Sequence, residues 1–324
     1  MRRRALLALV PLLAACVSAP QHETVRVTIA RGTPLRVVAE SLAAHGIVAA
    51  PRWFRVYASL LGEARSIPAG TYDLPRDASV REVLDALVHG PAATNRLTIP
   101  EGLMLSEVAE QVQQQLEIPV DSFLAAARDS TLRAEVGTSA PTLEGYLYPS
   151  TYRVPAGADA HEVVEQMVDE FRTRWQPAWT ARLDTLGMTR QQIVTLASII
   201  EGEVKVPEDR ELVSSVYHNR LSRGMRLQAD PTVIYALGTR RRLYEKDYTL
   251  KSPYNTYLID GLPPGPIGEP SVADIQAALY PAKTDYLYFV AGPNGKHIFS
   301  RTLREHLRAV NRVRRLAEEA RAAR

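Results

Sequence analysis

The sequence VTIARGTPLRVVA (residues 27–39) recurs in register as LTIPEGLMLSEVA (residues 97–109). Each copy combines a short β-rich run, a glycine that can form a turn, and apolar residues spaced at i, i+3 and i+4, as on one face of a helix. A second helix is expected after each copy, marked by Phe54 and Phe123. The recurrence predicts two similar strand–turn–helix–helix segments and therefore an α+β fold.

The residues between the two copies complete the first segment. Residues 67–74 predict a turn and a strand, and Ser79 is a plausible cap for a helix over residues 80–88. This strand–helix–helix–strand order resembles the LysM module, which binds N-acetylated glycans in cell walls. We therefore expect a small LysM-like α/β domain, proximal to the membrane, over residues 22–130. A plain α+β spacer that holds a catalytic domain off the membrane is an equally weighted alternative.

A second domain is expected over residues 140–324. The pattern loosens into small and polar residues over 129–142, and aromatic residues then cluster over 144–152. Helices are predicted over 160–175, 190–204 and 208–223, the last closed by Gly224. Further predictions follow in chain order: a Pro- and Gly-rich loop over 250–270, a helix over 272–279, a strand over 286–290, a turn at 293–295 and a final helix from about residue 303.

The helix predicted over 190–204 carries two carboxylates. Its apolar stripe is core packing, and Glu201 and Glu203 project to opposite margins of that stripe at ~100° per residue. Half-burial there would raise a carboxyl pKa, which suits a general acid. Periodicity alone leaves open which glutamate acts, and a surface carboxylate is the more ordinary alternative for either. The stripe consists of Ile193, Leu196, Ala197, Ile200 and Val204.

The amino terminus predicts export. Three arginines precede an apolar stretch over residues 5–15, which is well short of the ~20 residues that a membrane-spanning helix needs. The stretch ends in LAAC (residues 13–16), which resembles the bacterial lipoprotein signal. We expect residues 1–20 to be signal and anchor, Cys16 to be lipidated, and the catalytic domain to be membrane-anchored in the periplasm. An uncleaved signal anchor and a buried helix are the alternatives, and the choice between inner and outer membrane stays open because Val17 follows the cysteine.

Composition excludes several classes of function. The 39 basic and 36 acidic residues are too balanced for a nucleic-acid binder. Cys16 is the only cysteine, so the folded part has no disulfide, thiolate nucleophile or Cys-based metal site. The seven histidines are scattered without ligand spacing, so no metal site and no cofactor are expected.

Six ordered motifs carry a resemblance to a known family. The helix of the two glutamates ends in ASIIEGE (residues 197–203), and the other motifs are LEGYLYP (143–149), NRL (219–221), MRLQADPT (225–232), SPYNTY (252–257) and GLPPGPI (261–267). From residue 144 to residue 306 the chain resembles the endolytic murein transglycosylase (YceG-like) family. It departs from the family pattern at residues 268–271, where Asn-Pro-Gly is more usual, and at Leu307, where Asn is usual.

The resemblance implies a peptidoglycan lytic transglycosylase, a lyase that cleaves the MurNAc–GlcNAc bond of nascent strands without water and leaves 1,6-anhydro-MurNAc ends. It maps the catalytic acid and base to Glu201, and it implies a role in ending strand elongation and in wall organisation, with wall-elongation synthases (penicillin-binding proteins) as partners. Substrate contacts are expected from Glu144, Tyr148, Tyr152, Glu203, Gln228, Asp230, Ser252, Tyr254, Asn255 and Thr256.

Alternatives remain at several positions. Glu144 could instead be a second active-site acid or a turn-forming partner of Arg or Lys, and Asp230 could cap a helix that begins at Pro231. The tyrosines could stack on sugars or simply pack. A muramidase that pairs Glu201 with Glu144 or Asp230 around a water is the main rival function. A catalytically silent wall-binding scaffold is the rival from another class.

Overall fold

The computed structural model describes residues 23–30, 32–64, 67–76, 78–89 and 93–322. They divide into two units, each with its own hydrophobic core. Unit 1 runs to Ala93 and includes Pro155–Gly157, and unit 2 contains Thr94–Val154 and Ala158–Arg324. The predicted lipidation site Cys16 and the whole predicted signal and anchor, residues 1–20, lie outside the described residues.

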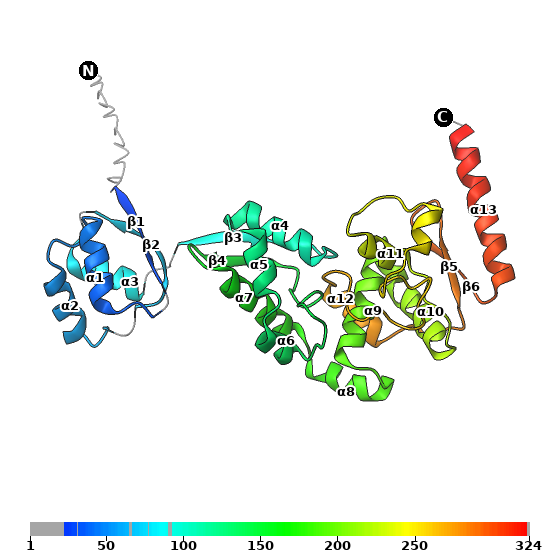
Figure 1. Cartoon of the computed structure of the whole chain (residues 1–324), viewed down its shortest axis with the longest axis horizontal. Helices are drawn as coiled ribbons and strands as arrows, with labels where there is room; N and C mark the ends of the chain where they lie inside the picture. The colour runs from blue at the N-terminus through cyan, green and yellow to red at the C-terminus, as the bar shows by residue number, and fades with distance from the viewer. Residues whose placement is uncertain (1–22, 31, 65–66, 77, 90–92, 323–324) are drawn as a thin grey trace, which may run out of the picture. The chain divides into compact units, whose positions relative to one another are not determined.

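Unit 1 has the predicted strand–helix–helix–strand order, followed by a third helix (Figure 1). The two strands pair antiparallel, from Thr24 opposite Pro75 to Ile29 opposite Gly70. Ser79 caps the third helix, as predicted, because its side chain accepts from the Glu82 amide in a capping box. The likeness of this unit to LysM stays a prediction. Its elements are β1 (Thr24–Ile29), α1 (Leu35–Ala44), α2 (Pro51–Leu60), β2 (Gly70–Pro75) and α3 (Val80–Val88).

Unit 2 contains the other copy of the repeat and the rest of the chain (Figure 1). β3 pairs with β4, and β5 pairs antiparallel with β6. Two 3-10 turns, Pro207–Asp209 and Glu245–Thr249, lie between its later elements. These elements are β3 (Thr94–Thr98), α4 (Leu105–Leu116), α5 (Val120–Ala126), α6 (Ser130–Val136), β4 (Thr151–Pro155), α7 (Ala160–Arg174), α8 (Pro177–Leu186), α9 (Arg190–Glu203), α10 (Arg210–Ser222), α11 (Asp230–Leu237), α12 (Val272–Leu279), β5 (Tyr288–Ala291), β6 (His297–Ser300) and α13 (Leu303–Ala322).

The two copies of the repeat fall in different units. The boundary lies between Ala93 and Thr94, whereas the sequence predicted one between residues 130 and 140. The reason is packing: Leu97, Val108 and Phe123 are buried in the same core as the helices that follow residue 160. Residues 129–142, where the sequence pattern loosens, also contain a helix, α6, whose first amides are capped by Asp129.

The later elements mostly agree with prediction. α7 and α9 each end one residue before the predicted end, α12 matches, and residues 250–270 contain neither helix nor strand. The predicted turn at 293–295 joins β5 to β6, a strand the sequence did not predict. α8 was also missed, because Trp179 is its only fully buried residue and it therefore shows no apolar stripe.

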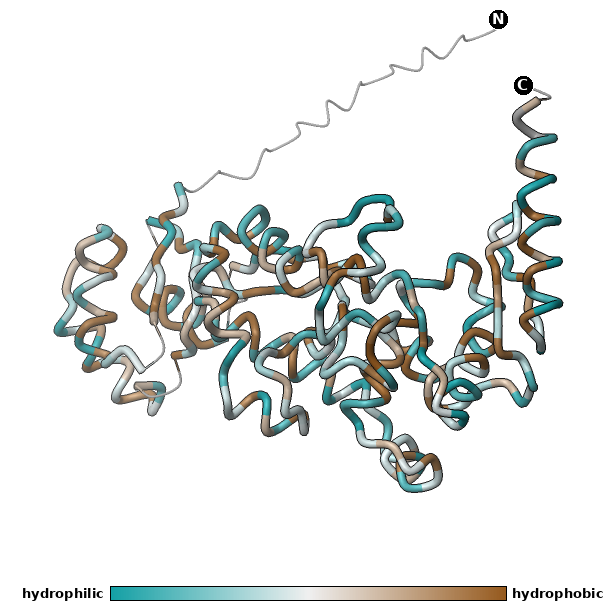
Figure 2. The backbone as a smooth tube through the Cα atoms, turned by 45° about the vertical axis from the view of Figure 1, so that its right-hand side comes forward, coloured by the Kyte–Doolittle hydropathy of each residue, from teal (hydrophilic) through white to brown (hydrophobic). Residues whose placement is uncertain are grey.

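The last helix, α13, alternates hydrophilic and hydrophobic residues along its length, shown as teal and brown in Figure 2. Among the described parts of the chain, no helix has both the length and the apolar content needed to cross a bilayer.

Candidate active site

Helix α9 runs through the core of unit 2 and carries both candidate glutamates in its last turn. It begins at a capping box in which Thr189 accepts from the Gln192 amide. Residues 193–200 are all buried, because α9 packs against α10, α11 and α12. The sequence predicted one apolar stripe with a glutamate at each margin. Instead the helix is enclosed, and the glutamates become accessible only where it ends.

Glu201 lies against the turn of the second repeat copy. A Cβ atom on Gly102 would sit 3.2 Å from Glu201 Oε1, and Gly102 adopts a φ of +74°, which favours glycine. Three carboxyl oxygens, one each from Glu101, Glu201 and Asp274, lie within 4.8 Å of one another. The Glu201 side chain remains 19% exposed, so a ligand can reach it. The sequence contained the Glu101-Gly102 turn, but nothing local indicated that it meets Glu201.

These surroundings favour the protonated form of Glu201. Burial raises the pKa of its carboxyl to about 8, and hydrogen bonding to and repulsion by Asp274, together with repulsion by Glu101, act in the same direction. Arg210 opposes the rise, with its Nη2 atom 3.9 Å from Glu201 Oε2. At neutral pH, Glu201 can therefore donate a proton.

Asp274 is the buried partner of this arrangement. It is fully buried, and its Oδ1 accepts from Arg210 Nε at 2.7 Å. Its Oδ2 accepts from the Ser271 hydroxyl and from the Ser271 amide, in the capping box that begins α12. Sequence reasoning missed Arg210 and Asp274. The capping pattern of Ser271 and Asp274 was visible, but it gave no sign that the same carboxylate approaches Glu201.

The turn that faces Glu201 is fixed by long-range bonds. Gly102 N donates to the Glu269 carbonyl at 2.7 Å, and Glu269 N donates to the Leu103 carbonyl at 2.9 Å. Arg240 donates to the Gly102 carbonyl and to both carboxyl oxygens of Glu107. Glu269 stands where the chain departs from the family pattern. The departure from the family pattern therefore contacts the turn that lies against Glu201, although Glu269 is not bonded to Glu201 itself.

Glu144 and Glu269 are internal supports. Glu144 is 5% exposed and accepts from the Leu105 amide at 2.8 Å and from the Tyr235 hydroxyl at 3.1 Å. Glu269 is fully buried and accepts from the amides of Gly145 and Leu147. Burial raises the pKa of Glu144 to about 8 and that of Glu269 well above its usual range. Glu144 therefore stabilises the start of α4. Its carboxyl group is bonded to neither an Arg nor a Lys side chain, and its burial does not fit the predicted contact with substrate.

Glu203 lies in different surroundings from Glu201. Between them, Gly202 allows α11 to approach, because a Cβ atom there would lie 2.6 Å from Pro231 Cβ. Glu203 accepts from the Tyr217 hydroxyl at 3.2 Å. Burial, then repulsion by Asp230, raises the pKa of Glu203 to about 7.

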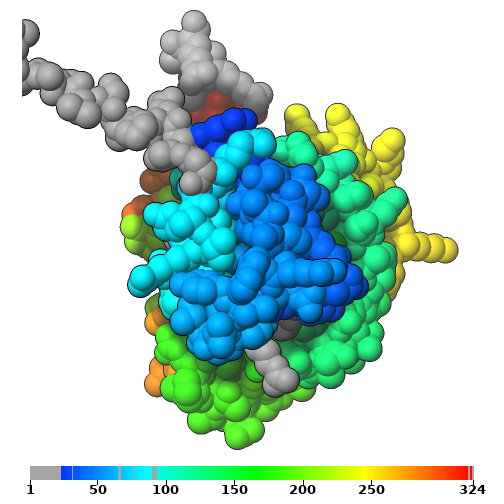
Figure 3. Space-filling model, turned by 90° about the vertical axis from the view of Figure 1, so that its left-hand side faces the viewer, coloured from blue at the N-terminus to red at the C-terminus, as the bar shows by residue number. Residues whose placement is uncertain are grey.

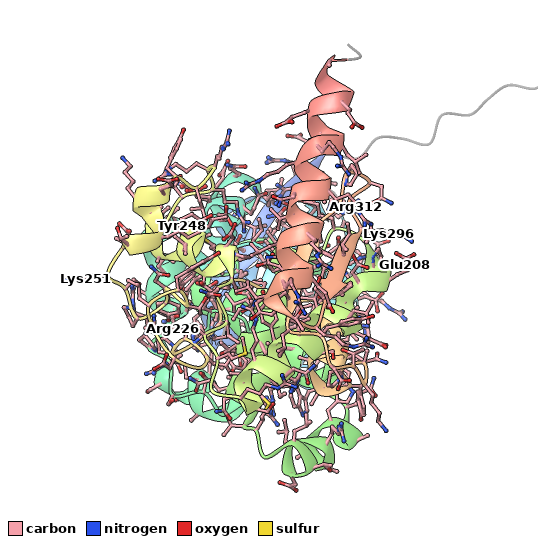
Figure 4. The ribbon with its side chains drawn as sticks, turned by 90° about the vertical axis from the view of Figure 1, so that its right-hand side faces the viewer. Glu208, Arg226, Tyr248, Lys251, Lys296 and Arg312 are labelled. Carbon is pink, nitrogen blue, oxygen red and sulfur yellow. The ribbon has the colours of Figure 1, made fainter. Side chains whose placement is uncertain are left out.

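A hollow of about 440 Å³ brings together three predicted substrate residues: Glu203, Gln228 and Asp230. Asp230 accepts from Tyr257 at 2.7 Å and from Tyr248, labelled in Figure 4, at 3.4 Å. Its side chain caps no amide of α11, whose N-cap is Ala229, so the capping alternative does not hold. The hollow is further lined by Arg220, Leu227, Tyr257, Tyr288, Phe289, Val290, Ala291, His297, Leu303 and His306.

The SPYNTY loop mainly supports the fold. Asn255 and Thr256 are fully buried. Asn255 donates to the carbonyls of Tyr248 and Leu250, and Thr256 bonds the Ala229 amide and the Thr232 hydroxyl. Their predicted contact with N-acetyl groups therefore does not fit the structure, since their polar atoms are already used. Ser252 and Tyr254 are partly exposed, and the Tyr254 ring packs on Tyr235 with centroids 4.7 Å apart.

The two earlier tyrosines also differ in accessibility. Tyr152 is 5% exposed and donates to the Tyr148 carbonyl, so packing describes it better than stacking on a sugar. Tyr148 is partly exposed, and the Arg174 guanidinium lies 5.4 Å from its ring centroid. Of the predicted tyrosines, Tyr148 and Tyr254 keep surface for a ligand.

The comparisons with known proteins agree with the motifs. A model of the YceG-like family matches residues 27–312. The chain is 30% identical over 303 residues to the endolytic murein transglycosylase of Bacillus subtilis (strain 168), covering 88% of this chain and 84% of that protein. It is 29% identical over 327 residues to the protein of the same name from Streptococcus pneumoniae serotype 2 (strain D39 / NCTC 7466), covering 91% of this chain but 59% of that protein.

A solved structure extends the match to the fold. The crystal structure of a yceG-like protein from Listeria monocytogenes aligns with a TM-score of 0.61 and 32% identity, covering 89% of this chain and 99% of that one. The resemblance seen in the motifs is thereby confirmed: this chain belongs to the YceG-like family.

Proposed function

We propose that this chain is an endolytic peptidoglycan lytic transglycosylase that cleaves the MurNAc–GlcNAc bond with Glu201 as general acid and then general base. One observation carries the assignment: Glu201 is partly exposed at the end of an enclosed helix, and its pKa of about 8 keeps it protonated at neutral pH. The family membership and the names of two relatives, both endolytic murein transglycosylases, support it. An enzyme of this type is a lyase.

The chemistry needs a single carboxyl group. Glu201 donates its proton to the glycosidic oxygen as the bond to the muramic acid C1 breaks. The 6-hydroxyl of the same muramic acid then attacks C1, and the Glu201 carboxylate takes the hydroxyl proton, so the enzyme returns to its starting state. The nucleophile is already tethered to the reacting carbon, so no water has to be positioned. The product ends in 1,6-anhydro-MurNAc.

Neither carboxylate that a muramidase was predicted to pair with Glu201 is suited to that role, and the exposed Glu101 beside Glu201 is the remaining carboxylate that product analysis has to test. A hydrolase would need a second carboxylate that reaches a water or the sugar. Asp274 is fully buried and paired with Arg210, while Glu144 is buried and bonded to the start of α4. Asp230 lines the hollow of Glu203, whereas the groups around Glu201 are Glu101, Arg210 and Asp274.

The hollow of Glu203, Gln228 and Asp230 is a candidate second contact for the glycan strand. Gln228 is exposed there, and Asp230 keeps part of its surface. The aromatic ring of Tyr257 lines the same hollow beside these polar groups, a combination that suits a sugar. Tyr148, Ser252 and Tyr254 remain candidates for peripheral contacts.

Product analysis tests the function. Purified protein acting on isolated sacculi should release muropeptides one water lighter than hydrolytic products and resistant to borohydride reduction. Reducing ends would instead indicate the muramidase. Binding to sacculi without any turnover would indicate the scaffold. Lysozyme digestion of the same sacculi is the matched control for hydrolytic mass.

The anchoring and cellular role are further parts of the proposal. We propose that Cys16 is lipidated, that the catalytic unit works at the periplasmic face of a membrane, and that unit 1 is a LysM-like element near that membrane. Ending of nascent strands beside wall-elongation synthases is the role that fits an endolytic cut. Intact mass of membrane-extracted protein should show a lipidated chain that starts at Cys16, and Cys16→Ser should block processing. An unlipidated chain that starts at Met1 would contradict the anchor.

A further inference from the structure

The second helix of unit 1 exposes an apolar stripe. Trp53 is 72% exposed, Val56 47% and Leu60 79%, and their spacing of three and four residues places them on one face of α2. The opposite face holds the buried residues Phe54 and Ala58. Because the buried face already supplies the packing of α2 in unit 1, packing within this unit does not explain the exposed stripe.

Arginines border this stripe. α1 and α2 pack against each other, and a hollow of about 690 Å³ between them is lined by Arg36, Arg52 and Arg55 together with Leu35, Val56, Ser59 and Leu60. Arg36 is paired with Glu40 at 2.9 Å. Arg52 and Arg55 are exposed and have no acidic partner among the residues that the structure describes. Figure 3 shows the face of unit 1 to which these helices belong, in blue.

We propose that this α1–α2 face lies on the surface of an anionic lipid bilayer, with Trp53 and Leu60 inserted at the level of the headgroups and Arg52 and Arg55 on lipid phosphates. Tryptophan and leucine on one face with arginine beside them are the composition of a helix that lies in the interface. Unpaired arginines can bind anionic headgroups, and the apolar stripe can be buried at the boundary between the headgroups and the acyl chains. A hollow with two unpaired arginines in its lining is large enough to admit a phosphate headgroup.

The chain geometry fits this placement and rests in part on the proposed lipid anchor. Six residues, 17–22, separate Cys16 from the first described residue, Glu23. Even fully extended, such a connection reaches roughly 25 Å, at about 3.5 Å per residue. A lipid on Cys16 would therefore hold unit 1 close to the headgroups. Charge and apolar exposure carry the proposal without the anchor.

The test uses the tryptophan of the face as a reporter. The full chain is reconstituted with vesicles of phosphatidylglycerol and phosphatidylcholine, or of phosphatidylcholine alone, each with and without brominated acyl chains. Comparison with Trp53→Phe isolates the Trp53 signal from Trp175 and Trp179, and α13, which also carries arginines, contains no tryptophan. Attachment is measured separately by co-sedimentation.

We expect brominated lipid to quench Trp53 several-fold more in the anionic vesicles. Arg52→Glu with Arg55→Glu should reduce the quenching to the level in neutral vesicles, whereas the matched reversal Arg81→Glu on α3 should leave it unchanged. Chain that co-sediments with both vesicles while Trp53 stays unquenched would keep the anchor and overturn the proposed face, which would then belong to a protein partner. Equal quenching in the double variant and the wild type would also overturn it.

Discussion

The two copies of the repeat have the same local structure and different surroundings. Gly32 and Gly102 occupy the same place in each copy, with φ values of +75° and +74°. A Cβ atom on Gly32 would meet nothing within 4 Å, whereas one on Gly102 would meet the Glu201 carboxyl. The turn of the repeat therefore lies beside the proposed catalytic glutamate only in unit 2.

The helices that follow the two turns also differ in how many side chains bond their first amides. The first turn of α1 has no side-chain cap. The first turn of α4 receives the Glu144 carboxyl at the Leu105 amide and the Glu107 carboxyl at the Met104 amide. Glu107 also pairs with Arg240, which bonds the Gly102 carbonyl. The difference teaches that the local sequence forms the turn, and that distant residues decide which side chains the turn contacts.

The largest expected effect comes from the carboxyl that the second copy faces. Glu201→Gln removes the only proton donor proposed, so kcat should fall by about 10²–10⁴. Glu203→Gln, the matched change two residues away, should retain activity within about tenfold. Release of anhydro-muropeptides by each variant measures this. Equal losses would show that the two glutamates act together, and near wild-type turnover in Glu201→Gln would refute the assignment.

The comparison between the copies is tested most directly at the glycines. Gly102→Ala and Gly32→Ala place the same side chain at nearly the same φ, so both should lose about 1–2 kcal/mol of stability. Only Gly102→Ala should crowd Glu201, and a small misplacement of the acid should lower kcat by roughly tenfold or more. Thermal unfolding and turnover are measured on both. Similar turnover in the two variants would contradict the proposed contact between turn and acid.

A smaller effect is expected from the buried partner of the acid. Asp274 raises the pKa of Glu201 and Arg210 lowers it. Asp274→Asn removes the like charge and leaves Arg210 in place, so the pKa of Glu201 should fall. Because the proton donor must be protonated, the alkaline limb of kcat/KM should move to lower pH by on the order of one unit.

At a pH below the pKa of Glu201 in both proteins, the Asp274→Asn variant and the wild type should have similar kcat/KM, provided that the fold is intact. Asp73→Asn is the matched control, since it changes an Arg–Asp pair of unit 1. An alkaline limb that does not move, with activity reduced equally at all pH values, would indicate that Asp274 has only a structural role.

The sequence by itself determined the repeat, the α+β class, the family and the helix that carries Glu201, because helix periodicity, turn glycines and ordered motifs are local signals. It did not determine the boundary between units, because the second copy shares one hydrophobic core with residues more than 50 positions away. It also could not exclude Asn255 and Thr256 as sugar contacts, because the sequence of a loop does not indicate whether its polar residues are buried or exposed.

Only the tertiary structure decided what surrounds the acid. Gly102, Arg210 and Asp274 come from three elements, and their approach to Glu201 depends on how α9 packs against α10 and α12. The pKa of Glu201 is likewise a property of that packing, because burial and neighbouring charge raise it and neither is encoded at the position itself. Local sequence specified a glutamate at the end of a helix, and long-range packing supplied the surroundings that raise its pKa.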